Sequence, residues 1–354
     1  MNAQFTQHNL IFKQASGTSR GVLTTKETYL LEISENNQKG IGECAIFRGL
    51  SYDDVPDYEE KLTWLCKNIN LDFEVLKKEL LHYPSIIFGL EQALLNLEHG
   101  EDLYFPSDFT DGKDSIKING LIWMGNADFM QSQIEEKLAK GFDCIKLKIG
   151  VDWKSEKEII KKLREKFPKE QLELRVDANG AFSYEEARMV LQELADLGIH
   201  SIEQPIKKSE VRSPKSEENS EKKSTDCCVP WNEMAKLCAE TPTPIALDEE
   251  LIGVIDFEEK KKLLETIKPQ YIILKPALVG GFSGSDEWIA IAESLGINWW
   301  ITSALESNIG LNAICQYTYT KKNPLPQGLG TGALFTNNFE THLQLEGDQM
   351  WHKK

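Results

Sequence analysis

The sequence has little positive charge, few histidines and no long apolar run. Lys and Arg number 40 against 56 Asp and Glu, so the formal net charge is -16 at pH 7. That charge repels a phosphate backbone, and no basic stripe with interleaved aromatics offsets it, so we expect no nucleic-acid partner. No stretch of about 18 apolar residues occurs, and the first 20 residues lack an apolar signal segment. We therefore expect no membrane partner and a cytoplasmic location.

The cysteines are too scattered to suggest a disulfide framework or a zinc motif. Seven are present, an odd number, and no two of them form a CxxC pair. Reduced thiols are the expectation.

The overall composition is that of an ordinary globular protein. A hydrophobic fraction of 41% and a charged fraction of 27% argue against extensive disorder. A length of 354 residues exceeds most single cores, so two domains are expected.

Residues 1–115 show the pattern of a small α+β unit. Apolar and polar positions first alternate between Gly, Asn and Ser turns, and apolar residues then recur at helical spacing. These patterns predict strands at 10–12, 29–33 and 42–47 and helices at 53–68, 72–81 and 85–99. A capping signal at 51–54 is expected to open the first helix.

From residue 116 the pattern changes to short apolar runs that alternate with amphipathic segments, which is typical of parallel β/α units. The predicted strands are 116–118, 144–148, 172–177, 201–204, 245–248, 271–275 and 298–302. The predicted helices include 155–167, 184–197, 256–267 and 285–295. This alternation predicts a β/α barrel.

One interval between predicted strands is longer than the others. Glu203 and Asp248 lie 45 residues apart, and the surplus coincides with the Ser-, Lys- and Glu-rich segment 207–230. A segment with so few apolar residues cannot bury enough surface to offset its ordering entropy. We expect a solvated loop insertion.

Polar side chains lie at the ends of the predicted barrel strands, where barrels of this kind carry their active sites. Strand side chains alternate between faces, so Lys146 and Lys148 project to one side of their strand. The same alternation places Arg175, Asp177 and Asn179 on one face of the next strand. Both sets are expected to point into the barrel.

Three carboxylates at successive strand ends predict a metal site. Glu203 and Asp248 end the next two strands, so together with Asp177 they reach one rim, and Lys275 ends the strand after them. Three uncompensated carboxylates would repel one another, and a bound cation removes that repulsion. Oxygen ligands without His or Cys suit Mg²⁺, or Mn²⁺ in its place, better than Zn²⁺.

Lys148 is the predicted base. A lysine beside a divalent cation and a second lysine gives up its proton more readily than an exposed one. It would remove a proton next to a substrate carboxylate while the metal stabilises the resulting enediolate, with Lys275 across the site. Each residue alone is more often a structural ion pair or an exposed side chain. Their joint arrival at consecutive strand ends is what predicts an active site.

The order KxK, Asp, Glu, Asp and Lys on successive strands resembles the muconate-lactonising branch of the enolase superfamily. The likeness covers nearly the whole chain. It implies a modified TIM barrel of the (β/α)7β type at 116–320, with an α+β capping domain formed by residues 1–115 and 321–354. The implied roles are a base at Lys148, a second lysine at Lys275 on the opposite face of the substrate, support from Lys146, Asn179 and the neighbouring Arg175, and Mg²⁺ ligands at Asp177, Glu203 and Asp248.

Within this branch, the segments SGTSRGVLTTKETYLLEI, GIGECAIFRGLS, LKPALVGGF and TSALESNIGL are similar to the o-succinylbenzoate synthase family of menaquinone biosynthesis. The resemblance implies a carbon–oxygen lyase that dehydrates 2-succinyl-6-hydroxy-2,4-cyclohexadiene-1-carboxylate to 2-succinylbenzoate. Ser303 and Arg20 are the expected contacts for this small-molecule carboxylate. Ser19, Gly21 and Phe47 are further candidate walls.

The core motifs leave other functions open. An N-acylamino-acid racemase or dipeptide epimerase uses the same metal site with lysines on both faces of the substrate, and a muconate cycloisomerase is a third possibility. A barrel that had lost catalysis and served as a binding protein would lack a base or a metal ligand, and here all six positions are present. The sequence does not define the oligomeric state.

Overall fold

The structure is a computed structural model that describes residues 1–18, 21–123, 127–208 and 231–354. Arg20, Ser19 and nearly all of the segment 207–230 lie outside the described residues. The substrate contact expected at Arg20 and the expected loop insertion therefore stay predictions.

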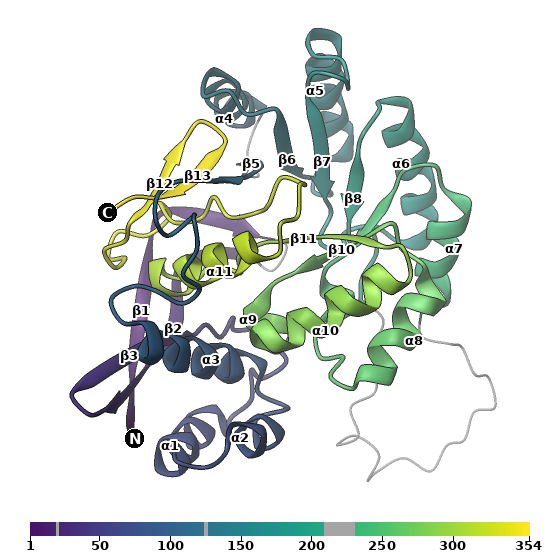
Figure 1. Ribbon diagram of the computed structural model, residues 1–354. Helices are drawn as coiled ribbons and strands as arrows, with labels where there is room; N and C mark the ends of the chain where they lie inside the picture. Colours follow the sequence, from purple (N-terminus) through teal and green to yellow (C-terminus); the bar gives the residue numbers. More distant parts are fainter. Residues whose placement is uncertain (19–20, 124–126, 209–230) are drawn as a thin grey trace, which may run out of the picture.

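The N-terminal unit is a three-stranded antiparallel sheet packed against helices (Figure 1). Its elements are β1 (Asn2–Thr18), β2 (Gly21–Glu35), β3 (Gln38–Cys44), α1 (Tyr58–Asn68), α2 (Phe73–Glu79) and α3 (Pro84–His99). Tyr29, Leu31 and Ile33 alternate along β2, and all three are buried in one core cluster with residues of the helices. The antiparallel sheet and helices predicted from the sequence are present.

The predicted start of the first helix at 51–54 is wrong, because these side chains bind elsewhere. The helix α1 begins at Tyr58. The Ser51 hydroxyl accepts a hydrogen bond from the backbone N–H of Phe47 at 2.8 Å. Asp53 Oδ2 accepts from the backbone N–H and the hydroxyl of Ser85, at 2.9 and 2.6 Å, in the first turn of α3. Asp53 thus provides a hydrogen-bond acceptor for a backbone N–H in the first turn of α3, whose own N-cap residue makes no side-chain hydrogen bond.

The larger unit is a seven-stranded parallel sheet in the order β5-β6-β7-β8-β9-β10-β11. Its strands are β5 (Gly120–Ile122), β6 (Cys144–Lys148), β7 (Glu173–Asp177), β8 (Ser201–Glu203), β9 (Ile245–Leu247), β10 (Tyr271–Leu274) and β11 (Asn298–Ile301). The helices are α4 (Ala127–Ala139), α5 (Trp153–Lys166), α6 (Tyr184–Asp196), α7 (Asn232–Glu240), α8 (Phe257–Ile267), α9 (Pro276–Val279), α10 (Gly281–Ser294) and α11 (Asn308–Thr320). Helices α5 to α8 and α10 lie around the outside of the sheet (Figure 1).

Two residues near the C-terminus close the sheet into a barrel. Gln327 pairs in parallel with Ile118, and Gly328 pairs with Thr302 just beyond β11. A Cβ atom at position 328 would lie 2.1 Å from Thr302 Oγ1, so glycine permits this close approach. The result is the modified TIM barrel that the sequence predicts. Gln327 and Gly328 lie in the tail 321–354 that was expected in the capping domain, and the domain boundaries stay a prediction.

The first two residues of the strand predicted at 116–118 belong to a different sheet, whereas Ile118 pairs in parallel with Gln327. The strand β4 (Ile116–Lys117) pairs antiparallel with β13 (Gln349–His352), which pairs with β12 (Leu343–Glu346). The parallel sheet begins at β5 instead. Two apolar residues around a lysine indicate a strand, but its partner is set by chain far away in the sequence.

Glu43 joins the N-terminal unit to the barrel. It is fully buried at the end of β3. Its carboxylate accepts hydrogen bonds from the hydroxyl and backbone N–H of Ser307, the backbone N–H of Gly310 and the hydroxyl of Thr28. Lys26 and Glu306 are buried beside it; burial lowers the pKa of Lys26, against the attraction of both carboxylates.

Glu91 of α3 makes a second connection between the two units. Its carboxylate accepts from the backbone N–H groups of Phe282 and Ser283, at 2.5 and 3.2 Å, in the first turn of α10. A Cβ atom at Gly281 would lie 2.2 Å from Glu91 Oε2. Burial raises the pKa of Glu91 to about 7.

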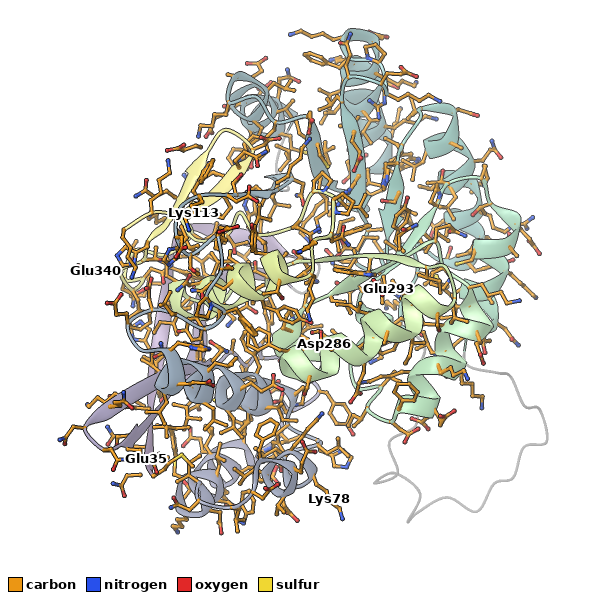
Figure 2. The ribbon with its side chains drawn as sticks, in the orientation of Figure 1. Glu35, Lys78, Lys113, Asp286, Glu293 and Glu340 are labelled. Atoms are coloured by element: carbon orange, nitrogen blue, oxygen red, sulfur yellow. The ribbon has the colours of Figure 1, made fainter. Side chains whose placement is uncertain are left out.

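Charged side chains cover the outer surface. Figure 2 labels Glu35, Lys78, Lys113, Asp286, Glu293 and Glu340, all of them exposed. Within the described part of the chain, no helix combines the length and apolar character needed to cross a membrane.

Candidate active site

Charged side chains gather where the parallel strands of the barrel end. The strands β6, β7 and β8 end at Lys148, Asp177 and Glu203, and Asp248 and Lys275 directly follow β9 and β10. Lys146 lies two residues before Lys148 and so shares its face of β6. Because all of these strands run in one direction, the side chains reach the same mouth of the barrel.

Lysine side chains link the three carboxylates. Lys146 Nζ lies 2.6 Å from Glu203 Oε2 and 3.5 Å from Asp177 Oδ2. Lys275 Nζ forms a salt bridge with Asp248 Oδ2 and lies 3.8 Å from Glu203 Oε1. The sequence-predicted ligands are thus brought together in one buried network.

Lys148 has a separate set of contacts at the edge of this network. Its Nζ lies 3.0 Å from Asp177 Oδ2 and donates a hydrogen bond to Asn179 Oδ1. Asn179 has a left-handed backbone with φ of 44°, which asparagine tolerates better than most residues. Its side-chain amide also donates to Glu249 Oε1 at 3.1 Å. Asn179 therefore orients the amine of Lys148.

Burial and neighbouring charges shift the acidity of the carboxyl groups. Burial, followed by repulsion from Asp177, raises the pKa of Glu203 to about 7. Burial also raises the pKa of Asp248, although Lys275 opposes the shift. For Asp177, burial is outweighed by Lys148 and Lys146, so its pKa is lowered. Additional positive charge beside Glu203 and Asp248 would favour their ionised forms.

The chemistry of these residues fits a hard divalent cation. All three carboxylates are at least nine-tenths buried, and Glu203 Oε1 has no hydrogen-bond partner among the described residues. The amines of Lys146 and Lys275 bridge the carboxylates of Asp177, Glu203 and Asp248. The three carboxylates do not form a group whose ligand oxygens all lie within 4.8 Å of one another. An oxygen-only donor set without His or Cys is nevertheless the one that Mg²⁺ prefers.

A pocket opens beside the network and has walls of two kinds. Its polar wall includes Lys146, Lys148, Asp177, Asn179, Glu249 and Lys275. Its apolar wall includes Phe47, Leu50, Leu121, Trp123, Ala304 and Leu305. Phe47 and Leu50 come from the segment after β3, so the N-terminal unit covers the barrel mouth. The pocket suits a ligand with an acidic end and an apolar ring.

Of two further residues predicted from the sequence, Ser303 lies at the pocket and Arg175 does not. Ser303 lines the pocket, and its hydroxyl shares a hydrogen bond of 2.6 Å with Thr331 Oγ1. Arg175 lies deeper in the barrel and does not line the pocket. It donates to the carbonyl oxygen of Pro326 at 2.8 Å and stacks on Trp300 at 4.3 Å, next to the closing segment.

Sequence reasoning missed several pocket residues. Asn119, Trp123 and Thr331 come from loops that carry no strand or helix pattern, so only the fold shows that they line the pocket. Glu249 could have been suspected, because it directly follows Asp248 and is acidic.

Matches to known proteins cover both units. Residues 3–97 match the MenC N-terminal domain family, and residues 130–216 and 226–349 match the enolase C-terminal domain-like family. An o-succinylbenzoate synthase from Desulfotalea psychrophila is 41% identical over 98% of this chain and 98% of its own length.

Solved structures agree with this assignment. The crystal structure of MenC from D. psychrophila superposes with a TM-score of 0.84 and 39% identity over 99% of both chains. A dipeptide epimerase from Enterococcus faecalis, solved with Mg and a dipeptide, shares the fold with a TM-score of 0.80 at 18% identity over 100% of this chain and 97% of its own. Taken with the carboxylates and lysines at the barrel mouth, these matches show that the chain belongs to the o-succinylbenzoate synthase family of the enolase superfamily.

Proposed function

We propose that this protein dehydrates 2-succinyl-6-hydroxy-2,4-cyclohexadiene-1-carboxylate to 2-succinylbenzoate, with Lys148 as the base. The observation that carries the proposal is the pocket beside the carboxylates, which Lys148 and Lys275 both line. Their strands, β6 and β10, are separated by three others in the sheet, so the two amines approach from opposite sides. The identity of 41% along nearly the whole chain supports the same reaction.

The chain's own residues account for the steps at the reacting carbon. Lys148 takes the proton next to the substrate carboxylate and returns it to the departing hydroxyl group, which leaves as water. Asn179 holds the Lys148 amine by its hydrogen bond, and Lys275 places positive charge across the pocket. Phe47, Leu50 and Trp123 would pack against the ring and limit the access of water.

We propose that Asp177, Glu203 and Asp248 hold Mg²⁺, or Mn²⁺ in its place. When bound, the ion supplies positive charge that stabilises the negative charge developing on the substrate carboxylate. The buried oxygen of Glu203 without a hydrogen-bond partner supports this assignment.

A substrate comparison tests the proposed reaction. The purified protein with Mg²⁺ is given the cyclohexadiene acid, and formation of the aromatic product is followed by its ultraviolet absorption. An N-succinylamino acid and muconate are assayed in parallel for racemisation and lactonisation. We expect dehydration to have the highest kcat/KM. Fast racemisation with no aromatic product would instead favour an N-acylamino-acid racemase or a dipeptide epimerase.

A substitution tests the metal ligands. Asp248→Asn should weaken Mg²⁺ binding by at least about 10- to 100-fold, because a neutral amide replaces a carboxylate at the ion. The exposed Asp111→Asn is the matched control. An unchanged Mg²⁺ requirement in Asp248→Asn would exclude this residue as a ligand.

The cytoplasmic location expected from the sequence is part of the same proposal. Cys44, Cys66, Cys144, Cys238 and Cys315 are free thiols, which is compatible with a reducing compartment.

A further inference from the structure

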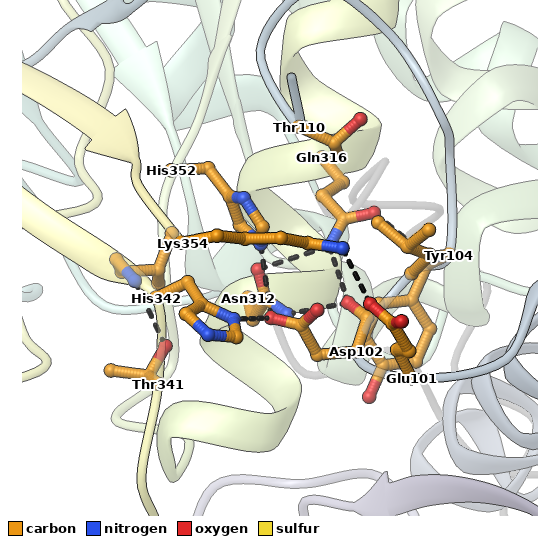
Figure 3. A network of polar contacts seen from close by, with 12 residues as sticks. Glu101, Asp102, Tyr104, Thr110, Asn312, Gln316, Thr341, His342, His352 and Lys354 are labelled. Atoms are coloured by element: carbon orange, nitrogen blue, oxygen red, sulfur yellow. Dashed lines mark hydrogen bonds and ion pairs between the residues drawn. The ribbon is translucent and has the colours of Figure 1, made fainter. Parts of the chain in front are cut away.

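Asp102, His342 and His352 meet outside the active-site pocket, although they are far apart in the sequence. Asp102 Oδ2 lies 2.6 Å from His342 Nδ1 and 3.0 Å from His352 Nε2 (Figure 3). Among the described residues, this is the only group of at least three His, Cys, Asp or Glu side chains whose ligand atoms all lie within 4.8 Å of one another.

The backbone around these side chains is held by contacts that do not involve them. The carbonyl oxygen of Asp102 accepts hydrogen bonds from the side-chain amides of Asn312 and Gln316 in α11, at 2.9 and 2.8 Å. Gln316 Oε1 in turn accepts from the backbone N–H of Tyr104 at 2.8 Å. The position of Asp102 is therefore fixed by the barrel's last helix.

The histidines lie at the open end of the β12–β13 hairpin. His352 pairs with Leu343, the residue directly after His342. The backbone N–H of Lys353 donates to the carbonyl oxygen of His342 at 2.8 Å, which extends the pairing. His342 precedes β12, and both imidazoles reach the same oxygen of Asp102.

Burial leaves one oxygen of this cluster without a partner. His352 is fully buried, whereas the side chains of Asp102 and His342 are 27% and 44% exposed. Asp102 Oδ1 is itself buried and has no hydrogen-bond partner among the described residues. The two histidines satisfy Oδ2 by hydrogen bonds, but nothing satisfies Oδ1 among the described residues. A buried carboxylate oxygen without a partner lowers stability, so a ligand at Oδ1 would be favourable.

The donor set points to a particular class of ligand. Two imidazole nitrogens and one carboxylate oxygen are the protein ligands of many zinc sites, in which a water molecule takes the fourth position. Tetrahedral Zn²⁺, with bonds of about 2.0–2.1 Å, places its ligand atoms about 3.3–3.4 Å apart. The half-exposed His342 has room for the small movement that this requires.

We propose that Asp102, His342 and His352 bind a divalent first-row transition-metal ion, with Zn²⁺ as the best match, at a site separate from the carboxylates of the barrel mouth. The ion would tie the C-terminal hairpin to the segment after α3. Water would complete its coordination on the exposed side, next to His342.

Zinc titration in the presence of Mg²⁺ tests this site. The full-length protein is first treated with a chelator and then saturated with Mg²⁺, which occupies the oxygen-only site. Calorimetric titration with Zn²⁺ should then show one equivalent bound, with a rise in Tm. Co²⁺ in place of Zn²⁺ should give the intense visible absorption of tetrahedral nitrogen-containing coordination.

Three variants separate the possible outcomes. His342→Ala and Asp102→Asn should each weaken Zn²⁺ binding by more than about tenfold and abolish the Co²⁺ bands. His99→Ala removes an exposed histidine from the end of α3 and should change neither. Circular dichroism checks that the variants fold. Zn²⁺ binding that is absent, that persists in His342→Ala, or that is lost instead in Asp248→Asn would overturn the proposal.

Discussion

Two buried glutamates of this protein, Glu43 and Glu203, differ in how many hydrogen bonds their carboxylates accept. Glu43, at the junction of the N-terminal unit and the barrel, accepts hydrogen bonds from two hydroxyl groups and two backbone N–H groups. Glu203, at the barrel mouth, accepts one bond from Lys146 and has an oxygen with no hydrogen-bond partner among the described residues. Both side chains are at least nine-tenths buried.

The difference shows how burial alone fails to identify a functional residue. A buried carboxylate with all its oxygens satisfied holds a structure together, as Glu43 holds the start of α11. A buried carboxylate that lacks hydrogen-bond donors lowers the stability of the folded protein. Such a residue is expected where a bound ligand supplies the missing donor or positive charge. By this comparison Glu203 at the barrel mouth has an oxygen that a bound ligand would satisfy, whereas Glu43 at the junction is fully satisfied by the protein.

The largest effect should come from removing the proposed base at the mouth. Lys148→Ala should lower kcat by a factor of about 10³ or more, because it removes the amine that Asn179 holds at the pocket. Turnover of the cyclohexadiene acid measures the effect. Lys140→Ala, which removes a half-exposed lysine from a surface ion pair, should leave turnover unchanged. Turnover of Lys148→Ala within tenfold of the unmodified protein would remove Lys148 as the base.

A matched pair of substitutions tests the comparison directly. Glu43→Gln should lower the free energy of unfolding by about 3–5 kcal/mol, because an amide cannot accept all four hydrogen bonds and Lys26 loses a buried counter-charge. Glu203→Gln should leave the stability of the Mg²⁺-free protein unchanged or higher, since it removes repulsion from Asp177. Urea unfolding without Mg²⁺ measures both. Equal losses in the two variants would contradict the distinction between the regions.

Glu91 allows a smaller, pH-dependent test at the junction. Its pKa is raised by burial to about 7, above the ordinary value of 4.5 for the unfolded chain. The protonated form is therefore favoured in the folded state, and its stabilising contribution is full below about pH 4.5 and is lost as the pH rises to about 7. The loss is up to about 3 kcal/mol.

Glu91→Gln should remove that part of the pH dependence. An uncharged amide oxygen still accepts from the N–H groups of Phe282 and Ser283, so the variant should be more stable than the unmodified protein at pH 8 and similar to it at pH 4.5. Unfolding free energies measured at both pH values check this. A parallel decline in both proteins would show that Glu91 does not ionise in this range.

The charged strand ends could be read from the sequence because two local rules suffice. Each barrel strand is a short apolar run that stops at a polar residue, and the alternation of faces tells which neighbours point the same way. Lys146, Lys148 and Asp177 follow from these rules without knowledge of the rest of the fold. The fully described strands from β6 to β11 lie within a few residues of their predictions.

What the sequence could not supply depends on contacts between distant segments. The closing pair Gln327 and Gly328 is too short for any periodic pattern, and it pairs with residues before β5 and after β11. Asp53 resembles a cap for the nearest helix, but it binds the start of α3 instead. In the same way, His342 and His352 form a candidate metal site only because the fold brings them to Asp102, which is more than 200 residues away in the sequence.

The closing segment also constrains the order of events during synthesis. Gln327 and Gly328 are translated after all seven strands of the parallel sheet. Gln327 bonds to the backbone at 117 and 119, and Gly328 bonds to the backbone at 301 and 303, so both are needed to complete the ring. Phe335 also packs against Phe12, with ring centroids 4.7 Å apart, and so joins residues from near the two ends of the chain. A chain that lacks residues 327 and 328 would therefore leave two unpaired strand edges in the barrel, and such edges favour aggregation.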